Sequence, residues 1–285
     1  MTVYNFVPAR NRKYGWIPDR PDKRDKLYSA VQPKIDLPQN LDLRGLCSTV
    51  EDQGSVGSCS GNAIAGVLEY LENKNAEQAY TVRKLSPCEK VKCALGFKTE
   101  GCDGRIPFTG FKDVSRLFIY YNARLLDGIQ NSDQGASMRT ALKSLNSIGY
   151  CWEELWPYNI SKVNIKPPTE CYKDAEIRKV VEYRSMLTRS EMLTCLAEGF
   201  PFVIGISIFE SFETPEVRST GIVPMPDPKE SSRGGHAIAI VGYDMKTERF
   251  IARNSWGTRW GMDGYFTIPF DYIAGYAWDA WTIRR

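Results

Sequence analysis

Four side chains in this sequence could together perform thiol-dependent acyl chemistry, and the first of them is Cys59. It follows the glycine- and serine-rich turn QGSVGSCSGN at the point where a helical pattern begins. Unpaired backbone N–H groups and the helix dipole favour a negative thiolate there, which makes Cys59 a candidate nucleophile. The alternative is a small buried thiol, because free cysteine is among the most buried residue types.

The proton partner of such a thiol has to be His236, which is the only histidine in the sequence. It follows two glycines and opens the apolar run AIAIVGY, which is typical of a strand. A purely structural histidine at a strand edge is the alternative. A zinc site is not expected, because there is no second imidazole to share the metal.

Asn254 is the residue expected to orient the imidazole. It lies 18 residues after His236 (254 − 236), a spacing that allows two antiparallel strands joined by a turn from Asp244 to Glu248. Trp256 would shield the resulting hydrogen bond from water and so strengthen it. The alternative for this segment is a tryptophan-rich core strand.

Gln53 completes the set, six residues before the candidate nucleophile (59 − 53). Its side-chain amide can return across the glycine turn and donate to the oxyanion of a tetrahedral intermediate, beside the backbone N–H of Cys59. A single glutamine carries little weight. Its offset from the cysteine, inside a Gly- and Ser-rich turn, is what makes it a candidate.

The overall composition is that of an ordinary globular protein. The chain has 285 residues, 42% of them hydrophobic, and a net charge of +3 without long single-sign blocks, so we expect no nucleic-acid partner. No stretch reaches membrane-spanning length, and if Met1 is the natural start a cleaved export signal is absent. Eight cysteines suit either disulfides or free thiols. The sequence therefore does not decide between an oxidising and a reducing cellular compartment.

The pattern of elements predicts an α+β fold. Residues 1–36 mix prolines, charges and aromatics and are expected to form an extended arm. Apolar spacing predicts helices from Cys59 onward and in FKDVSRLFIYYNARLL and SMRTALKSLNSIG, with an irregular insertion at residues 74–113. The runs FVIGISI, HAIAIVGYD, RFIARNSW and GYFTI predict strands. The first half is thus expected to be helical and the second mostly sheet.

Taken together, the four candidates resemble the papain and cathepsin family of cysteine peptidases, which orders its site as Gln, Cys, His, Asn. LPQNLDLRG is similar to the family's mature amino-terminus, GGHAIAIVGYD to its histidine strand and NSWGTRWGMDGYFTI to its asparagine strand. The resemblance implies a peptidase domain over residues 37–285. A helical lobe (55–155) and an antiparallel, β-barrel-like sheet lobe (165–285) would flank an active-site cleft.

The sequence departs from the usual family pattern in four respects. The paired loss of a disulfide, together with the GWIPDRPDKRD arm, resembles the bacterial branch of the family that includes xylellain. Ser60 stands where the family usually has tryptophan, and Val56 and Ser132 replace a disulfide-forming pair. Cys59 and His236 are 177 residues apart (236 − 59), against about 130–150 in the family, an excess that the insertion absorbs. The arm is shorter than the usual inhibitory propeptide, and we expect it to cross or border the cleft.

The resemblance implies an endopeptidase that acts on extended protein or peptide substrates through a Cys59 thioester, with no cofactor and no metal. Cys88, Cys93 and Cys102 do not have the paired spacing of common zinc sites. A catalytically silent binding protein and an acyl transferase with the same site remain alternatives. Substrate is expected to contact seven residues: Gly57, Ser58, Gln134, Gly135, Ala136, Gly235 and Trp256.

Overall fold

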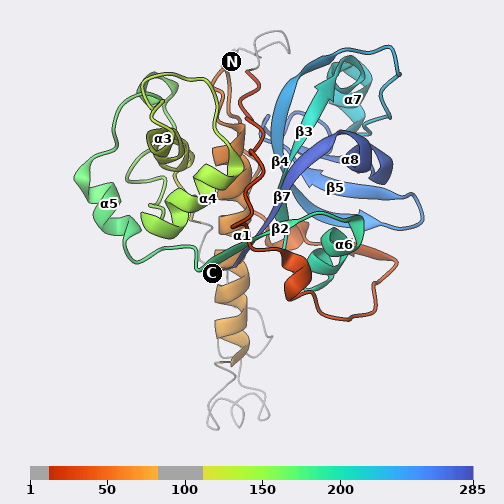
Figure 1. Ribbon diagram of the computed structural model, residues 1–285, viewed down its shortest axis with the longest axis horizontal. Helices are drawn as coiled ribbons and strands as arrows, with labels where there is room; N and C mark the ends of the chain where they lie inside the picture. Colours follow the sequence, from red (N-terminus) through yellow and green to blue (C-terminus); the bar gives the residue numbers. More distant parts are fainter. Residues whose placement is uncertain (1–12, 83–111, 285) are drawn as a thin grey trace, which may run out of the picture.

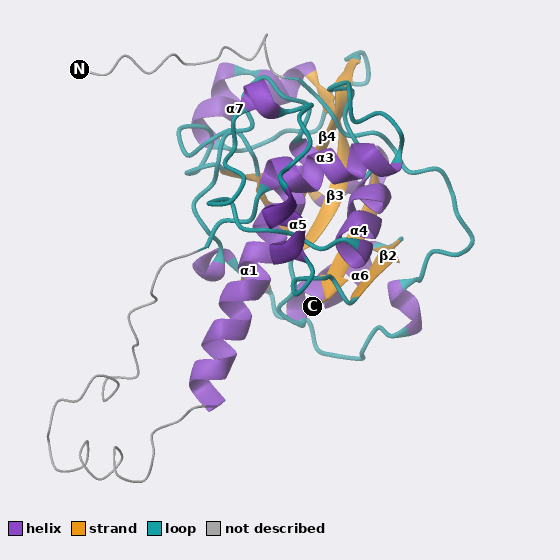
Figure 2. Cartoon of the chain, turned by 90° about the vertical axis from the view of Figure 1, so that its left-hand side faces the viewer, coloured by secondary structure: helices purple, strands orange, loops and turns teal. Residues whose placement is uncertain are grey.

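The structure is a computed structural model, and it describes residues 13–82 and 112–284. A long central helix, α1 (Cys59–Val82), separates a helical half from a sheet half (Figure 1). The first turns of α1 are buried almost all round, and its C-terminal turns extend away from both halves (Figures 1 and 2). Ile64, Val67 and Leu68 form one apolar face of this enclosed segment, and the buried polar side chains Asn62 and Glu69 lie elsewhere on it.

The helical half contains α3 (Arg116–Leu126), α4 (Met138–Ser147) and α5 (Thr169–Ala175), which lie together in Figure 2. The first two of these helices begin at serine caps. The Ser115 hydroxyl accepts from the N–H of Phe118, and the Ser137 side chain accepts from the N–H of Thr140. Both helices lie within the segments for which the apolar spacing predicts them.

The sheet half is built on seven antiparallel strands. Their order is β2-β7-β3-β4-β5-β6, and β1 pairs with the C-terminal end of β4. The four predicted runs correspond to β3, β4, β5 and β6. The strands are β1 (Asn40–Asp42), β2 (Glu182–Met186), β3 (Phe202–Phe209), β4 (Ser232–Asp244), β5 (Arg249–Arg253), β6 (Tyr265–Pro269) and β7 (Ala277–Arg284).

The sheet is open rather than closed into a barrel, which corrects the barrel-like expectation. Within the described residues, the terminal strands β2 and β6 pair with one neighbour each instead of with one another. Their outer edges carry single bridges to loop segments, from Leu27 to Ser185 on β2 and from Ile222 to Thr267 on β6. These bridges partly cover the edge strands, which a closed barrel would not have, and so limit pairing with other chains.

Shorter helical segments cover the sheet and connect its strands. The insertion predicted from residue 74 begins later, because α1 continues to Val82 through a segment that contains neither glycine nor proline. Residues 83–111, with the three cysteines of that insertion, lie outside the described residues. The remaining segments are α6 (Arg189–Ala197), α7 (Pro215–Thr220), α8 (Phe270–Tyr276) and the 3₁₀ turns Tyr28–Ala30, Arg44–Leu46, Ile160–Lys162 and Glu210–Glu213.

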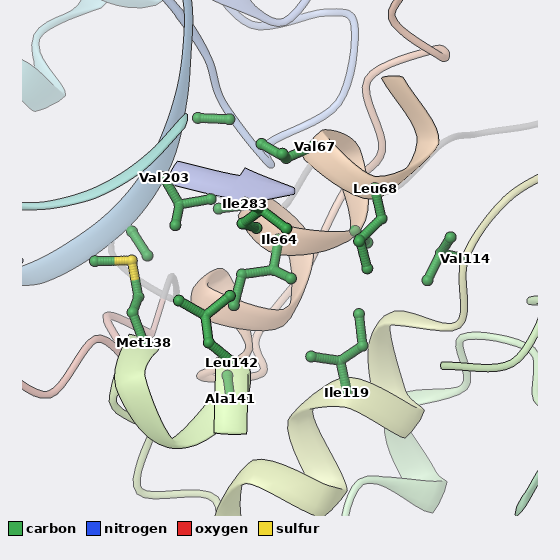
Figure 3. Packing of buried hydrophobic residues seen from close by; sticks show 14 of the residues in the cluster. Ile64, Val67, Leu68, Val114, Ile119, Met138, Ala141, Leu142, Val203 and Ile283 are labelled. Carbon is green, nitrogen blue, oxygen red and sulfur yellow. The ribbon is translucent and has the colours of Figure 1, made fainter. Parts of the chain in front are cut away.

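Strand β4 joins the two larger of the three hydrophobic cores among the described residues. Ala237 and Ala239 belong to the core around α1, whereas the alternating residues Ile238 and Ile240 belong to the core on the other side of the sheet. Figure 3 shows how α1 and α4 contribute to the first of these cores. Small side chains on one face of β4 let α1 approach closely, which brings the start of the helix to the strand that carries His236.

Candidate active site

Cys59 is the first residue of α1 and is fully buried. Burial raises the pKa of its thiol, and backbone hydrogen bonds involving Ala237, Gly15, Ser60 and Cys59 itself act in the opposite direction. Ala237 directly follows His236 on β4, so the thiol lies beside the histidine strand. Gly15 belongs to the arm, which therefore reaches the candidate nucleophile.

His236 and Asn254 form the hydrogen bond that their spacing predicts. Nε2 of His236 lies 2.9 Å from Oδ1 of Asn254, which also accepts from the N–H of Ser255 at 2.8 Å. Since an amide oxygen only accepts, Nε2 carries the hydrogen, and exchange with a thiol would use Nδ1. The β4–β5 hairpin turns where expected, with Asp244 opposite Arg249.

Aromatic rings enclose the imidazole. The Trp256 ring stacks on His236 with 5.0 Å between centroids and an interplanar angle of 26°. Tyr14 of the arm approaches the same imidazole edge-on at 6.0 Å. The His236–Asn254 bond is consequently buried, where a lower dielectric strengthens it. The shielding role expected of Trp256 agrees with this geometry.

The side chain of Gln53 is oriented by the residue after Asn254. Ser255 donates from its hydroxyl to Oε1 of Gln53 at 2.6 Å, so the amide NH₂ must face the other way. Nε2 donates to the carbonyl oxygens of Val56, at 2.9 Å, and of Lys13, at 3.2 Å. The Gln53 amide, which is expected to donate to an oxyanion, therefore already donates to a carbonyl oxygen of the arm.

Tyr158 supports the turn that carries the oxyanion donors, a role that no local sequence pattern indicates. Its hydroxyl donates to the carbonyl of Gln53 at 2.9 Å and lies 2.6 Å from the hydroxyl of Ser58. The Arg116 guanidinium lies 4.1 Å from the ring centroid. Only folding brings Tyr158 to this turn, 105 residues away from Gln53 (158 − 53). The WPY run by itself is a turn signal.

Two of the residues expected to contact substrate, Ala136 and Gly235, are paired with the arm. Ala136 donates its N–H to the carbonyl of Gly15 at 2.9 Å and accepts from the N–H of Ile17 at 3.3 Å. On the opposite side, Gly235 accepts from the N–H of Trp16 at 3.2 Å. The arm therefore bridges both halves, and in Figure 1 it is the red segment that descends between them. Gln134 is exposed, and Gly135 is buried beneath the arm.

Trp16 occupies a depression whose floor consists of two glycines. A Cβ atom on Gly205 would lie 2.0 Å from Cε2 of the indole, and one on Gly235 would lie 2.5 Å from Cε3. The indole is 6% exposed, and its Nε1 has no hydrogen-bond partner among the described residues. The indole fits here because residues 205 and 235 have no side chains. The sequence alone does not reveal this pocket, because only the fold brings the two glycines together.

The two positions that replace the family disulfide lie near this site without a covalent link. Val56 is buried, and the carbonyl of Ser132 accepts from Arg124 at 2.6 Å. The cysteines that the structure describes are free and buried. They are Cys47, Cys59, Cys151, Cys171 and Cys195.

Three other features bear on alternative functions. No helix among the described residues is long and apolar enough to cross a membrane. Within residues 13–82 and 112–284, no group of three or more His, Cys, Asp or Glu side chains could hold a metal ion. A cavity of about 430 Å³ opens between α6, α8 and β7, with Arg189, Phe270 and Trp278 in its lining, and it includes none of the candidate site residues.

A thiol at the start of a central helix, beside a strand whose histidine is oriented by an asparagine, is the arrangement of a papain-like cysteine peptidase. Comparison with known proteins agrees: the model of the papain family of cysteine proteases matches residues 37–273, and the chain belongs to this family. It is accordingly a hydrolase of the cysteine peptidase class.

Relatives extend the similarity beyond the peptidase domain. An uncharacterised peptidase C1-like protein of Acanthamoeba polyphaga mimivirus is 35% identical over 96% of this chain and 88% of its own length. Cysteine proteinase 3 of Entamoeba histolytica is 26% identical over 95% of this chain and 73% of its own. The crystal structure of xylellain, a cysteine protease from Xylella fastidiosa, superposes with a TM-score of 0.77, 33% identity and 99% coverage of both chains.

Digestive procathepsin L 3 of Tenebrio molitor shares the fold at 19% identity, with a TM-score of 0.65 and coverage of 96% of this chain and 76% of its own. The resemblance to the papain family, and to its xylellain-like branch, is therefore confirmed. The bacterial origin that this branch suggested stays a prediction.

Proposed function

We propose that this chain is an endopeptidase that cleaves peptide bonds through a thioester on Cys59. The observation that supports this most strongly is the 2.9 Å contact between His236 and Asn254. It fixes the imidazole on the strand whose next residue, Ala237, forms a backbone hydrogen bond with the Cys59 thiol. Nucleophile, base and orienting amide are thus connected through two adjacent strands and one helix start.

In this mechanism the Cys59 thiolate attacks the scissile carbonyl while His236 holds the proton as imidazolium. The backbone N–H of Cys59 and the Gln53 amide stabilise the oxyanion. The C–N bond then breaks, and His236 transfers its proton to the leaving amine. Water, deprotonated by the same imidazole, attacks the thioester, releases the carboxylic acid and restores the thiolate–imidazolium pair.

We also propose that residues 13–18 of the arm occlude this site from within the same molecule. The arm uses the atoms that an extended substrate needs, namely the Gln53 amide, the Gly235 carbonyl and both backbone groups of Ala136. Gly57 and Trp256 border the same path through their contacts with Gly15 and Tyr14, whereas the Ser58 hydroxyl contacts that of Tyr158. Access by substrate then requires the arm to lift.

The next part of the arm is held differently. Tyr28 is 1% exposed within the core of the sheet half, and its hydroxyl donates to Glu198. The carbonyl of Lys26 accepts from the N–H of Ser185 at 2.8 Å. Residues 26–30 are therefore part of the folded body, so opening would involve the segment before them, and a test should alter the arm without deleting it.

Intact-mass analysis after treatment with an epoxysuccinyl inhibitor tests both proposals. The unaltered chain should gain one adduct slowly, a Cys59→Ala chain none, and a Gly15→Ala chain one adduct at a higher rate. No adduct on either chain that retains the thiol would contradict the peptidase proposal and favour a silent binding protein. Products formed with an added amine would distinguish acyl transfer from hydrolysis.

A further inference from the structure

Asp133 presents a fixed negative charge next to the nucleophile. Its Oδ1 accepts from the backbone N–H of Gly57 at 3.0 Å and from the hydroxyl of Tyr120 at 2.7 Å. Gly57 lies two residues before Cys59, so the carboxylate is attached to the nucleophile's own turn. Its side chain is 17% exposed. Two donors from different elements thus hold a partly buried carboxylate in one orientation.

The arm places a cation on this carboxylate. Nζ of Lys13 lies 2.8 Å from Oδ2 of Asp133, and the carbonyl of the same Lys13 accepts from the Gln53 amide. One residue therefore combines a carbonyl at the oxyanion donor with an ammonium group at Asp133. A scissile residue must also place its carbonyl at Gln53, so its side chain comes within reach of the same carboxylate.

We propose that Asp133 is a specificity-determining residue that selects substrates with lysine or arginine at the residue supplying the scissile carbonyl. This inference rests on the proposed endopeptidase function and adds a substrate class to it. In the docked state Lys13 takes the place of that basic residue. When the arm lifts, the Asp133 carboxylate loses this cation and becomes available to a substrate.

The surrounding charges favour an external cation over an internal one. Arg124, nine residues before Asp133, donates to the carbonyl oxygens of Ser132 and Val163 and to the side chain of Asn164. Arg139, six residues after Asp133, pairs with Asp19 and Asp25. The ion pair that Asp133 forms within the described part of the chain is with Lys13. Because this carboxylate is partly buried, its pairing should be stronger than that of an exposed surface pair.

The test compares two peptides on the full-length chain that differ only in arginine or citrulline before the cleaved bond. Citrulline matches arginine in shape without its charge. The ratio of kcat/KM for the two peptides does not depend on how often the arm is open, because both need the same opening. We expect a ratio of about 10 for the unaltered chain, equivalent to one charged hydrogen bond.

Asp133→Asn should bring this ratio to about one, since the amide oxygen keeps an acceptor for Gly57 and Tyr120 without the charge. Raising the salt concentration should lower the ratio for the unaltered chain, a measurement that needs no variant. A ratio near one for the unaltered chain, or a high ratio that Asp133→Asn leaves unchanged, would overturn the inference. Cleavage of neither peptide, without an epoxysuccinyl adduct, would overturn the proposed function itself.

Discussion

Gly15 and Gly57 are packed so tightly that a Cβ atom on Gly15 would lie 1.8 Å from the carbonyl oxygen of Gly57. One residue belongs to the arm and the other to the turn that precedes the nucleophile. No side chain fits between them, so the arm can reach Cys59 only because residue 15 is a glycine. Docking of the arm therefore depends on a single absent methyl group.

Gly15→Ala should release the arm from the active site. We expect epoxysuccinyl labelling of Cys59 and turnover of peptide substrates to rise about tenfold or more, corresponding to a loss of at least ~1.4 kcal/mol in docking. Gly45→Ala is the matched control, because a Cβ at Gly45 meets nothing within 4 Å. Equal rates for the two variants would argue against an occluding arm.

Trp16→Ala should also activate the chain, through lost packing rather than a steric clash. Removal of a buried tryptophan costs about 3–5 kcal/mol in a core, and the part of this that belongs to docking should raise peptide turnover by tenfold or more. Trp278→Ala serves as control, because that indole is 58% exposed. The measurement is peptide turnover with the peptide in excess over the chain. Slower turnover by Trp16→Ala than by the unaltered chain would contradict the prediction.

The catalytic candidates and the main strands were predictable because short segments of sequence carry their signals. The glycine turn before Cys59 and the alternation around His236 depend on neighbours a few residues away. Trp16 itself is visible in the sequence, but its pocket needs Gly205 and Gly235 from two paired strands. The open sheet likewise depends on loop bridges such as the one from Leu27 to Ser185.

Asp133 and Tyr158 were missed for the same physical reason. Their partners Gly57 and Gln53 are 76 and 105 residues away, and no local pattern distinguishes such an aspartate or tyrosine from a solvent-exposed one. The length of α1 was underestimated because residues 74–82 lose their apolar spacing while keeping good helix formers. Apolar periodicity reveals a helix only where one face is buried, and the C-terminal turns of α1 extend away from the rest of the molecule.

Tyr158→Phe should impair the oxyanion site while leaving substrate binding intact. The change removes the hydrogen bond to the Gln53 carbonyl and the contact with the Ser58 hydroxyl, and leaves a buried acceptor unpaired. We expect kcat to fall about tenfold with little change in KM, measured by steady-state peptide hydrolysis. Tyr172→Phe removes a hydroxyl bonded to Asn122 in the helical half and should leave kcat unchanged. A larger effect on KM than on kcat would contradict a positioning role.

Docking of the arm should tighten in acid, because it brings carboxylates together. Asp19 of the arm donates its backbone N–H to Asp279 at 2.6 Å, and Asp19 and Asp25 both approach Arg139 of α4. Three carboxylates thus gather here, and two of them pair with the Arg139 guanidinium. Burial raises the pKa of Asp279 from 3.8 to about 6 against the lowering effect of the hydrogen bond from the Asp19 N–H, and repulsion from the Asp19 carboxylate adds a smaller rise. Burial also raises the pKa of Asp19.

The sign follows from linkage. We take the arm as the source of the burial that raises the pKa of Asp279, so docking takes up a proton, and its stabilisation is full in acid and is lost as the pH rises through about 6. A shift of two pKa units corresponds to at most about 100-fold in the docking constant, and less because solvent reaches part of this carboxyl. The chain should therefore open toward neutral pH.

The measurement is the epoxysuccinyl inactivation rate of the unaltered chain divided by that of Gly15→Ala, taken from pH 4.5 to 7.5. The division cancels the ionisation of Cys59 and His236 in the open state, which the two chains share. We expect the ratio to rise through pH 6 and Asp279→Asn to flatten it, because the amide removes the titrating group and its repulsion of Asp19 and Asp25. A ratio that falls as the pH rises would mean that carboxylate repulsion does not control the arm, and the ion pairs of Arg139 would then be the dominant contact.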